Sequence, residues 1–259
     1  MHYKTLTQHL AIAGCLTTCG IATTATQAAI TVVHEYHLGE AGSMDANGRP
    51  QDAVGGSHFT GYVTPSMTTD TASPSPVSSA YTTDTAANGG AWGANFAALP
   101  TDNFAVEIWA RTSNLAQGTV DLLQLNGMVN GSLKIGVANG VWVSSYHNVA
   151  WIGAPGGTGQ SISSGAWTHL AVIRDSGITT LYIDGVAQAG ATNGTPTHGS
   201  NGHIGVMANA IGGFTGDLDE MRIFTFQNGD DPVAFLNVPE PSSLALLSLA
   251  GLLVARRRR

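Results

Sequence analysis

The most informative part of this sequence for the fold is Ala166-Trp-Thr-His-Leu-Ala-Val-Ile-Arg174, followed by Ile178-Thr-Thr-Leu-Tyr-Ile-Asp-Gly185. Asp175-Ser-Gly177 lies between the two runs and predicts a tight turn, so we expect the runs to pair as a β-hairpin. Alternation along the first run places Trp167, His169, Ala171 and Ile173 on one face and Thr168, Leu170, Val172 and Arg174 on the other. Both faces are largely apolar, which is typical of a central strand. We therefore expect His169 in the core with one satisfied hydrogen bond, in preference to a catalytic role.

Similar β-rich runs recur through the middle of the chain. They predict strands at 104–111, 119–126, 133–138, 141–146, 167–174, 178–183, 186–188, 203–207 and 214–226. Asn139-Gly140 is a strong signal for a two-residue hairpin turn. The Ser-, Thr- and Pro-rich segment 64–90 is expected to be a long surface loop with one weak strand near 80–82. Because no long amphipathic helix is indicated, the pattern predicts an all-β fold, a two-sheet antiparallel jelly-roll sandwich.

The charge of the chain is low and unevenly distributed. Charged residues make up 10% of the chain, and residues 30–238 hold five Lys and Arg against sixteen Asp and Glu, for a net charge of −11. An acidic body argues against nucleic-acid binding, which needs basic surface, and is compatible with cation association.

Residues 1–29 have the features of a secretory signal peptide: a positive start at Lys4, an apolar stretch and small residues before position 30. A lipoprotein cleavage box at Ile12-Ala-Gly-Cys15 is the alternative. Both cysteines, Cys15 and Cys19, lie in this segment, so the mature chain is expected to contain neither disulfides nor a thiolate nucleophile.

The C-terminal segment 238–259 reads as a hydrophobic helix that tethers the chain to a membrane. Val238-Pro-Glu-Pro241 precedes an uncharged stretch, Ser242 to Ala255, and then four arginines. Fourteen helical residues span about 21 Å, less than a hydrocarbon core of about 30 Å, so a transient stop-transfer tether is expected. The arginines are expected to stay cytoplasmic.

This tail resembles the PEP-CTERM sorting signal. The residues that carry the resemblance are Pro239, Glu240, Pro241, Arg256, Arg257, Arg258 and Arg259. The resemblance implies export through the secretion machinery and removal of the tail by an exosortase, a membrane protease. It also implies a location at the cell envelope surface or in the extracellular matrix of a Gram-negative bacterium, near extracellular polysaccharide.

The body resembles laminin-G-like, concanavalin A-like domains. Four segments carry the resemblance: the central hairpin described above, Phe104 to Arg111, Gly213 to Phe224 and Tyr36 to Glu40. Their combination in this chain, over residues 31–228, is what makes the resemblance specific. The resemblance implies a jelly roll of two antiparallel sheets. We therefore divide the chain into a signal peptide at 1–29, a domain at 30–228, a linker at 229–237 and a sorting tail at 238–259.

Acidic residues give the candidate metal ligands. Asp45, Asn47, Asp52 and Asp219 predict a calcium site, because calcium prefers carboxylate and carbonyl oxygens in loops. The alternative is that Asn47-Gly48 is only a turn. Asp217, Asp219 and Glu220 are interpreted as part of a strand, with Glu220 paired to Arg222 or Arg174, and they lack the carboxylate spacing of glucanases on this fold. His34 and His37 are three residues apart on a strand and therefore face opposite sides, which disfavours a shared metal ion.

Three aromatic residues gather near one hairpin and form the candidate ligand site. Trp142, Tyr146 and Trp151 predict a platform on which sugar rings stack; the alternative is that these rings fill the core. These features favour an exported, non-catalytic protein of the cell surface or extracellular matrix that binds carbohydrate or matrix. A purely structural envelope component and a glycoside hydrolase on the same fold are the alternatives.

Overall fold

The computed structural model describes residues 30–63, 66–69, 79–83, 89–152, 160–190, 192–206 and 213–236. The predicted signal peptide and the predicted sorting tail with its hydrophobic helix lie outside these residues. Among the residues described, no helix is both long and apolar enough to cross a membrane.

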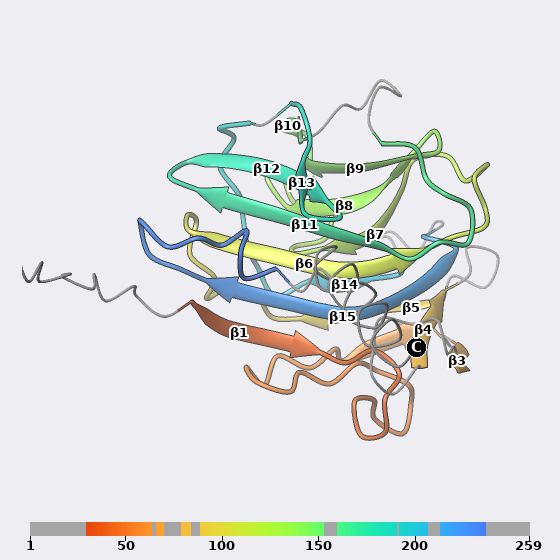
Figure 1. Ribbon diagram of the computed structural model, residues 1–259. Helices are drawn as coiled ribbons and strands as arrows, with labels where there is room; N and C mark the ends of the chain where they lie inside the picture. The colour runs from red at the N-terminus through yellow and green to blue at the C-terminus, as the bar shows by residue number, and fades with distance from the viewer. Residues whose placement is uncertain are drawn as a thin grey trace, which may run out of the picture.

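The described part of the chain forms strands that build two antiparallel sheets, and this confirms the predicted sandwich (Figure 1). The 8-stranded sheet has the order β13-β12-β11-β6-β15-β4-β3, with β1 also paired to β15, and the 7-stranded sheet has the order β10-β9-β8-β7-β14-β5-β2. The strands are β1 (Thr31–Tyr36), β2 (Gly61–Val63), β3 (Ser66–Thr69), β4 (Ser79–Thr83), β5 (Gly90–Ala94), β6 (Phe104–Arg111), β7 (Val120–Gln124), β8 (Leu133–Ala138), β9 (Val141–Tyr146), β10 (Ala150–Ile152), β11 (Thr168–Asp175), β12 (Ile178–Ile183), β13 (Val186–Ala187), β14 (Gly202–Ile204) and β15 (Gly216–Thr225).

The tight turns form where the sequence predicts them. Asn139 and Gly140 join β8 to β9 with φ angles of 52° and 77°. Ser176 and Gly177 join β11 to β12 with φ angles of 50° and 81°. Two successive residues with positive φ belong to the turn type whose twist matches that of the flanking strands.

The prediction of one long surface loop at residues 64–90 was wrong in part. Within residues 64–90, β3 and β4 pair with each other, and β4 extends the 8-stranded sheet beside β15. The strand predicted near 80–82 lies inside β4. The short strands β2, β5 and β10 were not predicted, because three to five residues carry too little alternation to stand out from a loop.

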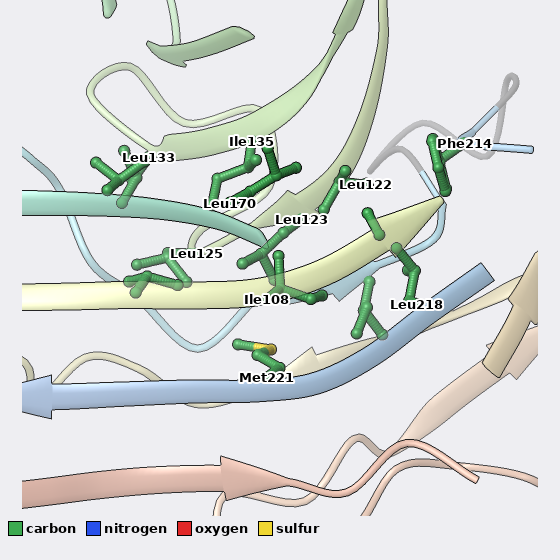
Figure 2. Close-up of a cluster of buried hydrophobic side chains, with 14 of the residues drawn as sticks. Ile108, Leu122, Leu123, Leu125, Leu133, Ile135, Leu170, Phe214, Leu218 and Met221 are labelled. Carbon is green, nitrogen blue, oxygen red and sulfur yellow. The ribbon is translucent and has the colours of Figure 1, made fainter. Parts of the chain in front are cut away.

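The core lies between the two sheets (Figure 2). Apolar side chains that alternate along each strand fill it, and Figure 2 labels Ile108, Leu122, Leu123, Leu125, Leu133, Ile135, Leu170, Phe214, Leu218 and Met221 among them. Burying one leucine-sized side chain contributes about 1.5–3 kcal/mol, so this layer is the main source of stability.

A second apolar layer covers the outer face of the 8-stranded sheet. We call residues 226–236 the C-terminal strap. Phe226 and Leu236 of the strap are buried in a cluster with Ala105, Ala171, Ile173 and Phe224. The Arg222 guanidinium lies over the Phe235 ring at 5.1 Å and donates to the Phe235 carbonyl at 3.1 Å. Residues 229–236, predicted as linker, are therefore packed against the domain.

Candidate functional site

The predicted aromatic platform does not form, because the alternation of β9 turns two of its rings inward. Trp142 and Tyr146 are each 1% exposed and belong to the core. The Tyr146 hydroxyl is bonded to the Thr179 hydroxyl at 2.7 Å. Trp151 alone keeps its predicted exposure, at 46%. Trp142 and Tyr146 therefore fill the core, as the alternative interpretation holds, and sugar stacking at Trp151 stays a prediction.

Strand register places Trp151 at one end of a row that crosses the 7-stranded sheet. Successive pairings join Trp92 to His203, His203 to Gln124, Gln124 to Lys134, Lys134 to Ser145 and Ser145 to Trp151. Directly opposed residues of antiparallel strands point to the same face. Because Trp142 and Tyr146 point into the core, Ser145 and the rest of the row point outward. We call these six residues the transverse row; its five strand-to-strand steps cover about 24 Å.

One carboxylate organises the middle of the transverse row. Asp121 Oδ2 accepts from Lys134 Nζ at 2.9 Å and from Gln124 Nε2 at 2.8 Å. Lys134 and Gln124 are both buried. The Gln124 amide is thereby oriented with its carbonyl oxygen away from Asp121.

Two acceptors in the row have no donor. Gln124 Oε1 and His203 Nδ1 are buried and lack a hydrogen-bond partner. His203 Nε2 lies 3.1 Å from Asn201 Oδ1, which can only accept, so Nε2 carries the proton and Nδ1 is an acceptor. Burial and the Lys134 charge lower the pKa of His203 to about 4, so its ring is neutral at pH 7. Buried polar groups without partners call for a water or a ligand hydroxyl.

A hollow of about 400 Å³ opens beside the exposed indole of Trp151. Its lining includes Asp121, Met128, Lys134, Ser145 and His147. An exposed aromatic face next to a charged pair and a hydroxyl suits a ligand with an apolar ring face and hydroxyl groups on its edge.

The predicted calcium residues occupy three separate places. Asp45 accepts from the backbone N–H of Asn47 and of Arg49, both at 2.9 Å, and from the Arg49 side chain at 2.6 Å. These bonds to Arg49 and Asn47 lower the pKa of Asp45 to about 2. Asn47 and Gly48 thus form a turn closed by Asp45, as the alternative interpretation proposed.

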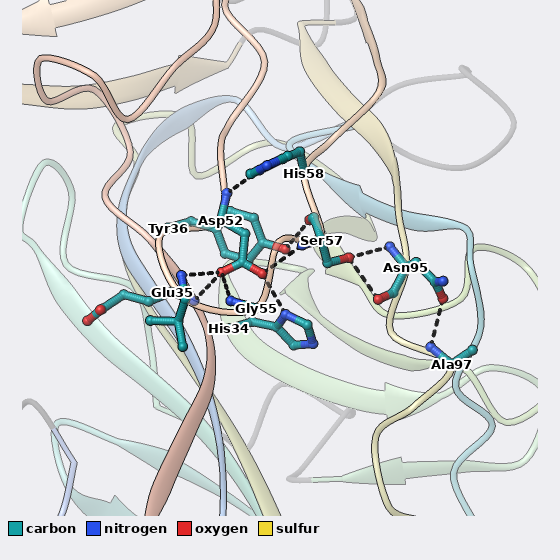
Figure 3. A network of polar contacts seen from close by, with 10 residues as sticks. His34, Glu35, Tyr36, Asp52, Gly55, Ser57, His58, Asn95 and Ala97 are labelled. Atoms are coloured by element: carbon teal, nitrogen blue, oxygen red, sulfur yellow. Dashed lines mark hydrogen bonds and ion pairs between the residues drawn. The ribbon is translucent and has the colours of Figure 1, made fainter.

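Asp52 organises the loop after β1 (Figure 3). Its side chain is fully buried and accepts from His34 Nδ1 at 2.7 Å. It also accepts from the backbone N–H groups of Glu35, Val54, Gly55 and Ser57, at 2.9–3.0 Å. Burial opposes ionisation, but the His34 and backbone hydrogen bonds outweigh it and lower the pKa of Asp52 well below its usual range. With its oxygens so engaged, Asp52 has a structural role.

Asp219 and Asp217 lie on β15. Asp219 is fully buried and accepts from the backbone N–H of Glu220 at 2.9 Å. Asp217 pairs with Arg111 at 2.7 Å and accepts from Thr82 at 2.6 Å. Within the described residues, the one group of three or more potential metal-ligating side chains contains none of Asp45, Asp52 and Asp219. The structure therefore does not assemble the predicted calcium site.

Comparisons with known proteins place this fold in a family. No curated protein matches the chain. A family model described as the concanavalin A-like lectin/glucanases superfamily matches residues 83–231, which is more than half of the chain. The chain belongs to this superfamily. A model of the PEP-CTERM protein-sorting motif matches residues 237–259, so this concanavalin A-like protein is an exported protein of the bacterial cell envelope whose tail is processed by an exosortase at the membrane.

Two solved structures illustrate the shared fold. Domain 4 of an extracellular arabinanase from Geobacillus stearothermophilus, in complex with arabinotriose, is 20% identical with a TM-score of 0.51, over 76% of this chain and 93% of that one. The botulinum neurotoxin serotype G binding domain is 12% identical with a TM-score of 0.50, over 80% of this chain and 50% of that one. At these identities the likeness shows the fold alone.

The histidine of the central hairpin has the predicted structural role in this concanavalin A-like protein. His169 is fully buried, and its Nε2 lies 2.8 Å from Glu107 Oε2. Glu107 also pairs with Arg222 across β6 and β15. The prediction that Glu220 pairs with Arg222 or Arg174 was wrong, because the bulge in β15 turns Glu220 toward β1.

Sequence reasoning missed one cluster that could hold a metal ion. His37, Glu40 and Glu220 each bring a ligand atom within 4.8 Å of the other two. His34 faces Asp52 instead, so the two histidines do not meet, as predicted. The only signal for the cluster in the sequence was the His37–Glu40 spacing, since Glu220 is 183 residues from His37.

Proposed function

We propose that this protein is an exported, non-catalytic module that binds carbohydrate through the outer face of its 7-stranded sheet. The observation that carries the proposal is the exposed Trp151 indole beside the hollow at the end of the transverse row. Pyranose and furanose rings have apolar faces that stack on indoles, and their hydroxyls can bond to polar side chains such as Lys134 and Ser145, which line the hollow.

The electrostatics of the face favour a neutral glycan. Lys134 is balanced by Asp121, and His203 is neutral, so the row together with Asp121 carries no net charge at pH 7. The surrounding domain is acidic and would repel a polyanion. A neutral extracellular polysaccharide at the cell envelope is the ligand class that this charge pattern supports.

The placement of carboxylates supports binding without hydrolysis. Glycosidases generally use two carboxyl groups that flank the bond to be cleaved. Among the described residues that line the Trp151 hollow, Asp121 is the one carboxylate, and it is engaged by Lys134 and Gln124. Asp217, on the other sheet, is paired with Arg111.

Titration of the purified full chain with a panel of neutral polysaccharides and oligosaccharides, including arabino-oligosaccharides, tests the proposal. We expect Trp151→Ala to weaken glycan binding at least tenfold, about 1.4 kcal/mol. Trp151→Phe is expected to bind more tightly than Trp151→Ala and more weakly than the parent chain. Tyr62→Ala is the matched control, because Tyr62 is an exposed aromatic residue of the same sheet outside the row. Equal affinity of the Trp151→Ala variant and the parent would contradict the proposal, and release of reducing ends would contradict its non-catalytic part.

A further inference from the structure

Four ionisable side chains meet where β1 ends beside β15. His37 directly follows β1, Glu40 lies in the next turn and Glu220 projects from β15. Glu220 Oε2 is 2.9 Å from His37 Nδ1, and Glu35 Oε2 is 3.8 Å from His37 Nε2. The cluster therefore combines one imidazole with three carboxylates.

An irregularity in β15 brings Glu220 to this place. The pairing of β15 with β6 shifts between Asp219 and Arg222, and Glu220 adopts a φ of 45°. A bulge of this kind re-aims a side chain that regular alternation would send elsewhere. The same segment thus directs Asp219 into the protein and Glu220 toward His37.

Within the described residues, the ion pairs that His37, Glu35 and Glu220 make with one another involve no Lys or Arg side chain. The Glu220 side chain is only 10% exposed, and its recorded ionic partner is His37. By contrast, Glu107, Asp121 and Asp217 meet Arg222, Lys134 and Arg111 respectively. Arg222 stands opposite Glu35 in the register, but its guanidinium is bonded to Glu107 and to the Phe235 carbonyl. Buried charges in proteins are paired or coordinate metal ions.

The pKa values of the two central residues, Glu220 and His37, are both raised. Burial raises the pKa of Glu220, and the nearby carboxylates of Glu40 and Glu35 raise it further against the effect of His37. At His37 burial disfavours the charged ring, but the bond to Glu220 and the three carboxylate charges outweigh burial and raise the pKa.

We propose that His37, Glu40 and Glu220 bind one first-row divalent transition ion of the Zn²⁺ class. An imidazole nitrogen with carboxylate oxygens is a donor set for zinc-like ions, whereas calcium takes oxygen donors only. Ligand atoms about 2.1 Å from a tetrahedral ion lie about 3.4 Å from one another. The ligand atoms of this cluster lie within 4.8 Å of one another. The side chains therefore need to approach one another by at most about 1.4 Å to bind the ion. Three protein ligands leave the fourth position to water.

Glu35 acts as a positioning residue for this site. Nδ1 faces Glu220 and is the nitrogen that meets the ion, which leaves Nε2–H directed toward the Glu35 carboxylate. Metal-bound histidines commonly donate their second N–H to a carboxylate, which fixes the tautomer and the ring orientation.

The test is titration of the metal-free, untagged full chain in detergent with Zn²⁺ and, separately, with Ca²⁺, followed by calorimetry. We expect one Zn²⁺ per chain, at least tenfold weaker binding for His37→Gln and for Glu220→Gln, and a smaller loss for Glu35→Gln. His147→Gln and Asp175→Asn, which remove an imidazole and a carboxylate far from the cluster, are expected to bind like the parent chain. Far-UV circular dichroism shows whether each variant is folded.

A second measurement on the unaltered chain does not depend on the variants. Co²⁺ in place of Zn²⁺ is expected to give the visible absorption of a four-coordinate ion, which one equivalent of Zn²⁺ abolishes. No saturable Zn²⁺ binding, binding that survives both His37→Gln and Glu220→Gln, or tighter binding of Ca²⁺ than of Zn²⁺ would each overturn the proposal.

Discussion

Asp52 shows how one side chain fixes the loop that follows the first strand. It was predicted as a calcium ligand because acidic residues in a Gly- and Asn-rich loop suit calcium. Its carboxylate instead accepts four backbone N–H groups and the His34 ring. In the sequence, both a carboxylate that accepts hydrogen bonds from buried N–H groups and a carboxylate that binds calcium appear as an acidic residue in a loop. The sequence therefore does not distinguish the two roles.

The first prediction concerns this carboxylate. We expect Asp52→Ala to lower the free energy of unfolding by about 3 kcal/mol, because it leaves buried N–H donors without an acceptor. The pKa of Asp52 is depressed in the folded state, so its contribution is present above the ordinary Asp pKa of about 3.9 and is lost as the pH falls below it. Urea denaturation between pH 2.5 and pH 7 measures both effects.

Asp175→Asn is the control for this experiment, because Asp175 is exposed at the end of β11. If Asp52→Ala lowered the free energy of unfolding no more than Asp175→Asn does, the Asp52 carboxylate would not be what holds the loop.

At the scale of elements, alternation identified most strands of the sheet centres and missed three of the strands at the sheet ends. β6, β8, β9, β11 and β12 have the predicted bounds to within one residue. β2, β3 and β10 lie at sheet ends and are short or rich in Ser and Thr. An edge strand is stabilised by backbone pairing with a neighbour from elsewhere in the chain, and that neighbour leaves no mark on the local sequence.

The C-terminal strap is the element that most changes the predicted domain boundary. Its Asp231 carboxylate accepts from the N–H groups of Val233 and Ala234, both at 3.1 Å, which holds the turn before Phe235 and Leu236. The matched sorting motif begins at residue 237, directly after the packed strap. The folded domain therefore reaches the start of the sorting motif without a free linker.

We expect Leu236→Ala to destabilise the domain by about 2–3 kcal/mol, because it removes a buried side chain from the outer apolar cluster. Val233→Ala is the matched control in the same strap, where the side chain is 37% exposed, and its effect should stay below about 0.5 kcal/mol. Thermal unfolding of the full chain compares the two variants. Equal effects would mean that the strap does not contribute to the stability of the fold.

At the scale of the whole molecule, the two sheets carry different candidate sites. The transverse row and the Trp151 hollow belong to the 7-stranded sheet, whereas the His37 cluster lies at the β1–β15 edge of the 8-stranded sheet (Figure 1). The apolar core separates the sheets, and the sites share no residue.

Sites that share no partners usually behave additively, so we expect glycan binding and metal binding to be independent. The Kd for the best glycan is expected to change less than twofold when Zn²⁺ is added or when His37 is replaced by Gln. Calorimetric titration with and without the metal measures this. A larger change would reveal coupling through the core.

The class of fold, the central strands with their turns, and the sorting motif can all be predicted from the sequence alone. These features depend on local patterns: side chains alternate with period two, Asn-Gly and Ser-Gly pairs accept positive φ, and a motif is a contiguous string. His169 was likewise predicted in the core, because its neighbours along one strand are apolar on both faces.

Which side chains meet depends on how the strands are assembled in three dimensions. Trp142 and Trp151 are close in sequence, yet one fills the core and the other is exposed, because strand orientation sets the face. The transverse row is formed by register across six strands, and the His37 cluster by a bulge in the last strand that meets the first. Both depend on pairing between distant segments, and the free energy of that pairing is a property of the assembled sheets rather than of any local stretch.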